Sequence, residues 1–415
     1  MDRRLQRALY GRQFRWTEMW LLVLPALFIL LALLDLLIVH NPAIANQLAQ
    51  KSLPPLDAFT PAIGLIVALI GVHILLNLIA PDADQTLLPI VGMLASIGVV
   101  MSLRLGPDIG GGRANLGVIQ LLWVVIGLFL CVLTVRLTRD LSWLRNYKYT
   151  WAAAGIALVA FTLVRAHEFS TRAPSRDVLD VGIHLGSLSL TFQPSELLKI
   201  CLVIFFAGYL SENREMLAAG GTRIGPFSLP PLKHLGPLVV MFGIALLLFI
   251  GVRELGLAML VFGLFLSMLY AASDRPSYVV FGLLIFAVGA FIAYHIFSYA
   301  RVRVDIVGNA FQQSSDAGYQ LVQGLIAFGH GGVFGDGLGL GHPYLTPASN
   351  TDFIAASFAE EFGFAGMLAL IGLFILLVYR GMHIASRARD TFSALMAIGL
   401  TAVFALQTLV ILAGN

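Results

Sequence analysis

The sequence predicts an all-α, polytopic membrane protein, and three observations lead to this prediction. Only 12% of the 415 residues are charged and 58% are hydrophobic, whereas soluble domains contain about 25% charged residues. Apolar runs of nearly 20 residues, long enough to cross a bilayer as a helix, recur along the chain. Short polar segments separate these runs. A helix satisfies its own backbone hydrogen bonds inside lipid, so each run is predicted to be a membrane span.

The first element is a basic segment, residues 1–18, which is predicted to be a cytoplasmic tail. Arginines recur through it, at positions Arg3, Arg4, Arg7, Arg12 and Arg15. The apolar run that follows, 19–39, is longer than the 7–15 residues of a signal-peptide core. We therefore interpret it as a retained first span whose N-terminus is cytoplasmic, as expected when positive charges flank a span on the inner side.

Eleven spans are predicted in one integral membrane domain that covers residues 1–415. They follow the apolar runs at 19–39, 60–80, 86–103, 117–136, 149–165, 195–210, 236–251, 254–272, 277–299, 353–379 and 392–412. With the N-terminus inside, the larger share of the 26 Lys and Arg residues falls in cytoplasmic segments. The two longest extracytoplasmic loops are then 166–194 and 300–352. The chain stops directly after an apolar run, so we expect a twelfth span in a complete protein.

The segment 319–366 is the part of the chain best suited to chemistry. Loops longer than about 12–15 residues are usually functional or disordered, and this one is too apolar for disorder. Its glycine run, Gly329–Gly341, has neither dinucleotide-binding nor P-loop spacing. The run indicates tight turns with positive φ, and the alternative is close approach to a ligand phosphate. The nearby histidines and Asp336 have no metal-ligand spacing, so no metal site built by the protein is predicted.

Three acids follow the glycine run. Asp352 precedes an apolar run, where it either caps a helix or acts as a general base. Glu360 lies about 80° around a helix from Asp352 and can share its side, whereas Glu361 lies about 180° away. Carboxylates at such positions are costly to bury unless they are paired or protonated.

Other charged residues stand where spans begin or end. Glu196 and Lys199 form an i,i+3 pair at the start of a span, which either holds helices together or faces a wet cavity. Glu254 lies at a predicted outer turn. It is either a simple exposed turn residue or part of a functional site. Arg301 and Arg303 follow another span, where they either anchor lipid headgroups or hold a diphosphate in fork geometry.

Four motifs together resemble the SEDS family of RodA, FtsW and SpoVE proteins, and they occur in that family's order. They are QPSELLK at 193–199, RELG at 253–256, YQLVQGLIAFGHGGVFGDGLGLG at 319–341 and TDFIAASFAEEFG at 351–363. The resemblance covers about residues 60–412, and the two extra N-terminal spans resemble the longer variety of the family. The family's usual His is replaced here by Asn350, and the acid of its QPDLG motif is Glu254.

The resemblance implies a peptidoglycan glycosyltransferase that polymerises lipid II at the outer face of the plasma membrane and releases undecaprenyl diphosphate. It implies a class B penicillin-binding protein, a transpeptidase, as the partner. Asp352 matches the family's essential acid. The predicted substrate-binding residues are Lys199, Glu196, Arg301, Arg303, Glu254 and Glu360. No built-in cofactor is expected, a divalent cation at the diphosphate is left open, and a net charge of +3 does not suggest nucleic acid. The alternatives are a lipid II flippase and a non-catalytic scaffold for the penicillin-binding protein.

Overall fold

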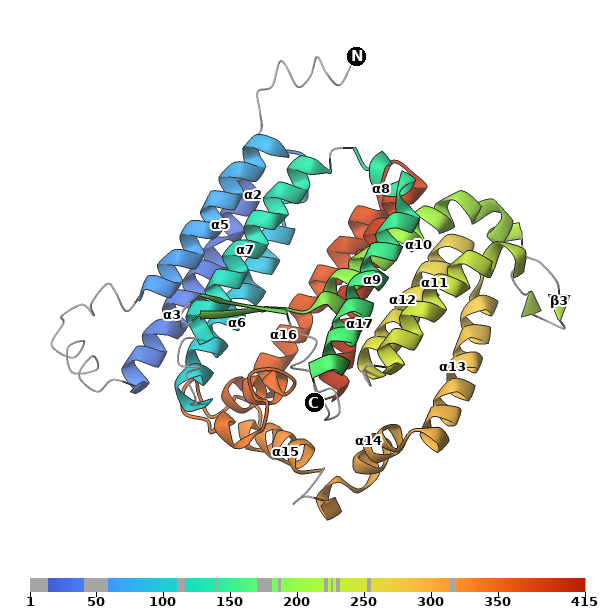
Figure 1. Ribbon diagram of the computed structural model, residues 1–415. Coiled ribbons are helices and arrows are strands. Elements are labelled where there is room, and N and C mark those ends of the chain that lie inside the picture. The colour runs from blue at the N-terminus through green and yellow to red at the C-terminus, as the bar shows by residue number, and fades with distance from the viewer. Residues whose placement is uncertain are drawn as a thin grey trace. The chain divides into compact units, whose positions relative to one another are not determined.

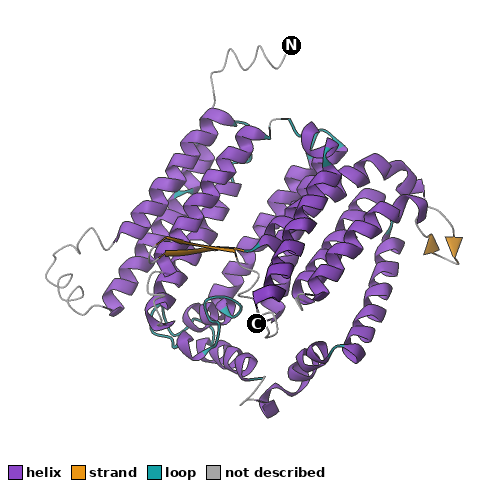
Figure 2. Ribbon diagram, viewed as in Figure 1, coloured by secondary structure: helices purple, strands orange, loops and turns teal. Residues whose placement is uncertain are grey.

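The computed structural model describes residues 14–40, 59–109, 116–138, 140–169, 181–185, 188–219, 223–224, 227–228, 232–251, 255–313 and 318–414. Helices dominate this part of the chain (Figure 2). The chain divides into two compact units. Unit 1 comprises Met1–Arg139, Gln320–Arg380 and Asn415, and unit 2 comprises Asp140–Tyr319 and Gly381–Gly414. The prediction of a single integral membrane domain stays a prediction.

The all-α, multi-pass prediction is confirmed. Among the described residues, nine helices are long and apolar enough to cross a membrane. They are Trp16–Val39, Thr60–Ile79, Leu87–Ile109, Leu116–Leu137, Pro194–Ala218, Leu255–Ser273, Pro276–Ile296, Ile354–Ser386 and Thr391–Gly414. Two shorter apolar helices, Lys148–Phe161 and Gly236–Leu248, fall where the two remaining spans are predicted. The chain is therefore a multi-pass membrane protein, and its orientation stays a prediction.

Unit 1 is a helical bundle followed by the segment that carries the predicted catalytic acid. Its elements are α2 (Trp16–Leu21), α3 (Val23–His40), α5 (Thr60–Ile79), α6 (Leu87–Ile109), α7 (Leu116–Leu137), α15 (Tyr319–Gly331), η5 (Pro343–Leu345) and α16 (Ile354–Ser386), of which α16 continues into unit 2 at Gly381. Figure 1 shows α3, α5, α6 and α7 running alongside one another, and α3 packs on α6 while α5 packs on α7. Fully buried Ile29, Leu65 and Val99 join these helices in one apolar core.

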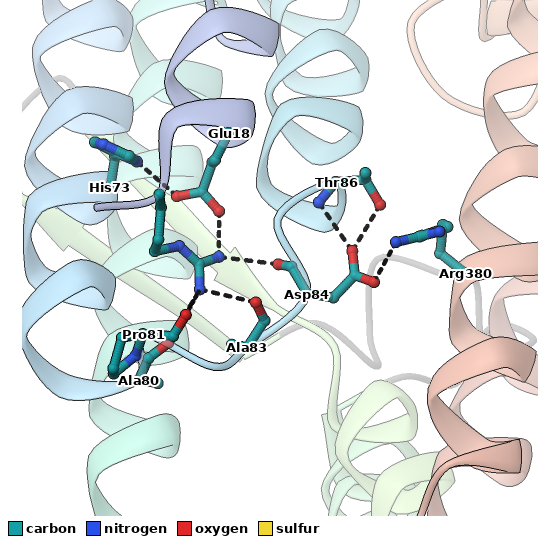
Figure 3. Close-up of polar contacts among 9 residues, drawn as sticks. Glu18, His73, Ala80, Pro81, Ala83, Asp84, Thr86 and Arg380 are labelled. Atoms are coloured by element: carbon teal, nitrogen blue, oxygen red, sulfur yellow. Dashed lines mark hydrogen bonds and ion pairs between the residues drawn. The ribbon is translucent and has the colours of Figure 1, made fainter. Parts of the chain in front are cut away.

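A buried polar cluster fixes the start of the first span to the α5–α6 connection (Figure 3). Glu18 of α2 pairs with Arg15 and also lies 2.7 Å from His73 Nδ1 of α5. The Arg15 guanidinium donates at 2.9 to 3.4 Å to the backbone carbonyls of Ala80, Pro81, Ala83 and Asp84. Arg15 and Glu18 are fully buried, and the predicted cytoplasmic tail, residues 1–18, stays a prediction.

The same connection holds the far end of α16 in unit 1. Asp84 accepts hydrogen bonds from the Thr86 backbone N–H and hydroxyl, and Arg380 pairs with its second oxygen at 2.6 Å (Figure 3). Burial by itself would raise the pKa of Asp84. The hydrogen bonds from Thr86 and the charge of Arg380 outweigh burial and hold that pKa below its usual value.

Unit 2 is organised around one long, buried helix, α10 (Pro194–Ala219). The other helices of the unit are α8 (Ser142–Asn146), α9 (Lys148–Phe169), α11 (Leu232–Gly251), α12 (Leu255–Ser273), α13 (Pro276–Ile296), α14 (Ser298–Asn309), η4 (Ala310–Gln313) and α17 (Thr391–Gly414). Helix α10 packs against α9, α12 and α17. Its residues Leu202, Phe205 and Phe206 are fully buried in the core of this unit.

Two short hairpins add strands to the predicted all-helical chain. Strand β1 (Val181–Leu185) pairs antiparallel with β2 (Leu188–Phe192), and β3 (Arg223–Ile224) pairs antiparallel with β4 (Phe227–Ser228). Both hairpins lie between predicted spans, so the span assignment is unaffected. The predicted long loop, 300–352, is also more regular than expected, because it contains most of α14 and all of α15.

Candidate active site

Helix α16 is broken near its start. Gly363 has φ 66° and ψ −171°, which is non-helical, so a short helix ends at Phe362 and a second one continues to Ser386. The prediction of one continuous span over 353–379 is wrong at this residue. A glycine allows this backbone conformation because it has no Cβ to clash at positive φ. The break leaves the carbonyls of the short helix and the N–H groups of the long helix without helical partners.

The glycine loop, residues 332–341, supplies those missing partners. The N–H groups of Phe364 and Ala365 donate to the carbonyls of Gly332 and Val333, at 2.9 and 3.0 Å. In the opposite direction, the N–H groups of Asp336 and Gly337 donate to the carbonyls of Glu360 and Glu361, at 2.9 and 3.1 Å. Four backbone groups at the break are thereby paired, as buried backbone groups in folded proteins require.

Glycine is needed in this loop for space as well as for conformation. Gly332, Gly335, Gly337 and Gly339 all have positive φ, which confirms the predicted tight turns. A Cβ on Gly335 would lie 2.7 Å from Gly363 N and closer still to the Glu361 carbonyl. The glycines therefore let the loop lie directly on the backbone of α16.

Arg104 clamps the same loop from α6. Its side chain is buried, and its Nε donates to Glu361 at 2.7 Å while Nη2 donates to the Gly341 carbonyl at 2.8 Å. It also pairs with Asp108 one turn further along α6. The predicted span ends at residue 103, whereas α6 continues to Ile109, so Arg104 lies within the helix. Arg104 is the cation that neutralises a buried acid of α16.

Glu360 is buried beside the glycine loop. Its Oε1 accepts the backbone N–H of His342 at 2.8 Å. Arg104 binds the Gly341 carbonyl and Glu360 binds the His342 N–H, so both polar atoms of the Gly341–His342 peptide group are held. The predicted substrate-binding role of Glu360 stays a prediction, and the contact observed is with the protein itself.

Asp352 is exposed on a turn whose neighbours are firmly held. The N–H groups of Thr351 and Phe353 both donate to the carbonyl of Ala348, at 3.0 and 3.1 Å. Ala348 has φ 55°, which is uncommon for a residue other than glycine. The Phe353 side chain is buried with Ala327 of α15 and Ala356 of α16. Helix α16 begins at Ile354, so Asp352 lies one position before the N-cap.

In unit 2, Lys199 and Glu196 form the predicted i,i+3 pair at the start of α10. Lys199 is 1% exposed, and its Nζ lies 2.7 Å from Glu196 and 2.9 Å from Gln407 Oε1 of α17. The Glu196 side chain remains 44% exposed. The pair therefore joins two helices and also keeps one carboxylate accessible, which leaves both predicted readings open.

The remaining predicted residues are distributed as follows. Arg301 and Arg303 lie on α14, both exposed. Arg301 donates to the Tyr294 and His295 carbonyls at the end of α13, at 3.4 and 3.0 Å. Glu254 lies outside the described residues. Within the described part of the chain, no group of three or more His, Cys, Asp or Glu side chains could hold a metal ion. The divalent cation at the diphosphate stays a prediction.

Arg104 is not among the predicted site residues because the predicted span ends at residue 103, six residues before the end of α6. The signal was present in the sequence, since an ionisable residue at the end of an apolar run is costly unless it is paired. The buried contact between Glu18 and His73 is also not predicted, because Glu18 is assigned to the tail and His73 lies within a predicted span.

Comparisons with known proteins place these features in context. A family model described as "Cell cycle protein", FTSW_RODA_SPOVE, matches residues 84–415. The protein named peptidoglycan glycosyltransferase RodA from Mycobacterium tuberculosis (strain ATCC 25618 / H37Rv) is 33% identical over 371 residues, which are 89% of this chain and 78% of that protein. The protein of the same name from Mycobacterium leprae is 34% identical over 345 residues, which are 82% of this chain and 72% of that protein.

A solved structure has the same fold. It comes from the study "Structural coordination of polymerization and crosslinking by a peptidoglycan synthase complex". The TM-score is 0.61 at 23% sequence identity, and the match covers 80% of this chain and 87% of that chain.

Proposed function

Because the chain belongs to the FtsW/RodA/SpoVE family, we propose that it is a peptidoglycan glycosyltransferase that polymerises lipid II into glycan strands at the outer face of the plasma membrane. The observation that carries this proposal is the 33% identity to a peptidoglycan glycosyltransferase over 89% of the chain. Asp352, exposed on a turn whose neighbours are hydrogen-bonded, gives the reaction a candidate general base.

The chemistry needs one base and a place for negative charge. A sugar hydroxyl attacks the anomeric carbon that carries undecaprenyl diphosphate, a new glycosidic bond forms, and the bond to the diphosphate breaks. The hydroxyl proton passes to the base, and the diphosphate leaves with the bonding electrons. A positioned carboxylate typically contributes about 10²–10⁴-fold to such a step.

Three features support Asp352 as this base. Its side chain is exposed to solvent, so a substrate hydroxyl can approach it. Its neighbours Thr351 and Phe353 are both bonded to one carbonyl, which restricts the backbone of Asp352. Residues 353–363, which follow it, are buried or half-buried, so the acid stands at the boundary between polar and apolar surroundings. Preorganisation of this kind reduces the reorganisation that the reaction would otherwise require.

For unit 2 by itself, we propose that Lys199 and Glu196 bind substrate. A buried ammonium group stabilises developing negative charge more strongly than one in water, because the local dielectric is low. Gln407 and Glu196 hold the ammonium in one position. When bound, a divalent cation would add positive charge at the diphosphate, and no step here depends on it.

The partner we propose is a transpeptidase, a class B penicillin-binding protein. The solved structure with the same fold comes from a study of a peptidoglycan synthase complex that coordinates polymerisation and crosslinking. Co-purification of this chain with such a protein from native membranes in mild detergent is the expected outcome. Recovery of this chain alone after crosslinking in those membranes would contradict it.

The decisive test of the function is Asp352→Asn, assayed as glycan strands formed from purified lipid II by the full-length protein with its partner. Asn keeps the shape and hydrogen-bonding ability of the side chain and removes the base. We expect polymerisation to fall at least about 100-fold, the lower end of what a general base contributes. The matched control is Asp336→Asn, an exposed acid on the glycine loop, which should polymerise normally.

Two other outcomes would count against the proposal. Normal polymerisation by Asp352→Asn would remove Asp352 from catalysis and leave it a structural role beside the helix start. No polymerisation by the wild-type protein together with normal co-purification of the transpeptidase would favour the scaffold alternative. Thermal unfolding of each variant shows whether a lost activity reflects lost folding.

A further inference from the structure

We propose that α14 is an interfacial helix, and that its face formed by Val304, Val307 and Arg303 binds the anionic phospholipid surface at the C-terminal end of α13. This function is separate from polymerisation. It assigns Arg303 to membrane lipid, whereas the sequence leaves this arginine open between a headgroup and a substrate diphosphate.

The position of α14 follows from the helix before it. Helix α13 has 21 apolar-rich residues, which extend about 31 Å at 1.5 Å per residue. The hydrocarbon core of a bilayer is about 30 Å thick. The chain therefore reaches the headgroup region at Ile296, and α14 begins two residues later, at Ser298. Figure 1 shows α14 turning away from the direction of α13.

The corner between the two helices is fixed by side chains. Phe297 is extended, with φ −102° and ψ 115°, which ends α13 and redirects the chain. Arg301 then donates to two carbonyls at the C-terminal end of α13, and its guanidinium lies over the Tyr294 ring at 5.8 Å. The Tyr294 hydroxyl also donates to Asp305 at 3.2 Å. These contacts hold α14 at the depth where α13 ends.

One face of α14 combines apolar and basic side chains. At 100° per residue, Val304 and Val307 lie about 60° apart, and Arg303 lies about 40° beyond Val307. Val304 is 57% exposed and Val307 is 77% exposed. Phe311, four residues after Val307, is exposed as well. An apolar stripe flanked by arginine is the pattern of helices that lie in the membrane interface.

The positive charge of Arg303 indicates that an anionic lipid binds this face of α14. Arg303 is exposed, and no hydrogen bond or ion pair of its guanidinium is found within the described residues. Beside an apolar stripe at headgroup depth, its complement is a lipid phosphate, which arginine binds in fork geometry. A basic residue near an anionic surface increases binding about fivefold.

The test uses full-length protein in nanodiscs, with Cys131→Ser to remove the exposed thiol and with Cys201 buried. A fluorophore on Val307→Cys is titrated with brominated phosphatidylglycerol against brominated phosphatidylcholine, which quench it on contact. We expect strong quenching, with about fivefold preference for phosphatidylglycerol. Adding Arg303→Gln should remove the preference. Adding Arg136→Gln, an exposed arginine at the end of α7, should not.

The matched control for Val307→Cys is a fluorophore on Val302→Cys. Val302 is also an exposed valine of α14, at 47%, but it lies about 160° around the helix from Val304. We expect weak quenching there. Equal quenching at the two positions, or none at Val307, overturns the proposal. Quenching at Val307 with the same affinity for both lipids overturns the assignment of Arg303. Shielding of Val307 only after the transpeptidase is added assigns the face to a protein instead.

Discussion

At the scale of single residues, the site depends on buried charges that have specific partners. Arg104 meets Glu361, Asp108 and the Gly341 carbonyl, so one guanidinium joins two helices and the glycine loop. Removing one partner of a buried pair is strongly destabilising because it leaves the other charge without compensation. The segment that ends at Asp352 thus depends on a residue nearly 250 positions earlier in the chain.

We predict that Arg104→Gln lowers the free energy of unfolding by about 3–5 kcal/mol, measured as thermal or denaturant unfolding of the purified protein in detergent. Glu361→Gln should lower it less, because Arg104 keeps its contacts with Asp108 and Gly341. The double variant should show a coupling energy of about 0.5–3 kcal/mol. Additive effects of the two substitutions would contradict a direct Arg104–Glu361 pair.

A second prediction concerns Asp84, whose pKa is held below its usual value. A carboxylate with a depressed folded-state pKa stabilises the protein above its unfolded pKa, about 3.9, and loses that contribution as the pH falls through the folded pKa. At pH 6, Asp84→Asn should therefore have a lower melting temperature than wild type. The gap should narrow as the pH falls below about 4. Asp336→Asn, at an exposed acid of the glycine loop, is the matched control; a melting-temperature gap for Asp84→Asn that is independent of pH would contradict the assignment.

At the scale of elements, α16 was predicted as one span and is in fact broken at Gly363. Hydrophobicity locates such a span because length and apolar content are enough to define it. The break depends on backbone partners in the glycine loop that are distant in sequence, and a lone Gly in an apolar run does not reveal them. The same limit applies to Lys199: its i,i+3 partner Glu196 follows from spacing, whereas its contact with Gln407 does not.

Gly363→Ala tests the break directly. Its Cβ would lie 2.6 Å from the Val333 carbonyl oxygen and closer still to Gly335 N, at a φ that L residues rarely adopt. We expect a loss of at least about 2 kcal/mol in unfolding free energy, from backbone strain and overpacking together. The control is Gly372→Ala in the same helix, where a Cβ meets nothing within 4 Å; that change should stabilise by about 0.5–1 kcal/mol. Equal effects of the two changes would mean that the break is not required.

At the scale of the whole molecule, composition predicted the all-helical membrane fold, and each predicted span coincides with a helix in the described residues. The two-unit division was not predicted, because it depends on which helices pack together. Unit 1 joins residues from both ends of the sequence, for example Leu65 with Leu338 in one core. Periodicity within a segment does not encode such pairings.

The orientation of the whole chain in the membrane is predicted from the distribution of Lys and Arg residues alone. After its break, α16 runs from Phe364 to Ser386, about 34 Å at 1.5 Å per residue, which is enough to cross the bilayer. Leu340, exposed on the glycine loop, and Ser386, exposed at the end of α16, should therefore lie on opposite sides of the membrane. The charge bias assigns Leu340 to the outside.

Single cysteines at these two positions test that assignment on intact cells. In a Cys131→Ser background, Leu340→Cys should react with a membrane-impermeant thiol reagent. Ser386→Cys should react only after permeabilisation. The reverse pattern would place Asp352 and the glycine loop in the cytoplasm, where glycan strands cannot be added to the wall, and the proposed reaction would lose its site. Reaction of both positions on intact cells would instead mean that the second part of α16 does not cross the membrane.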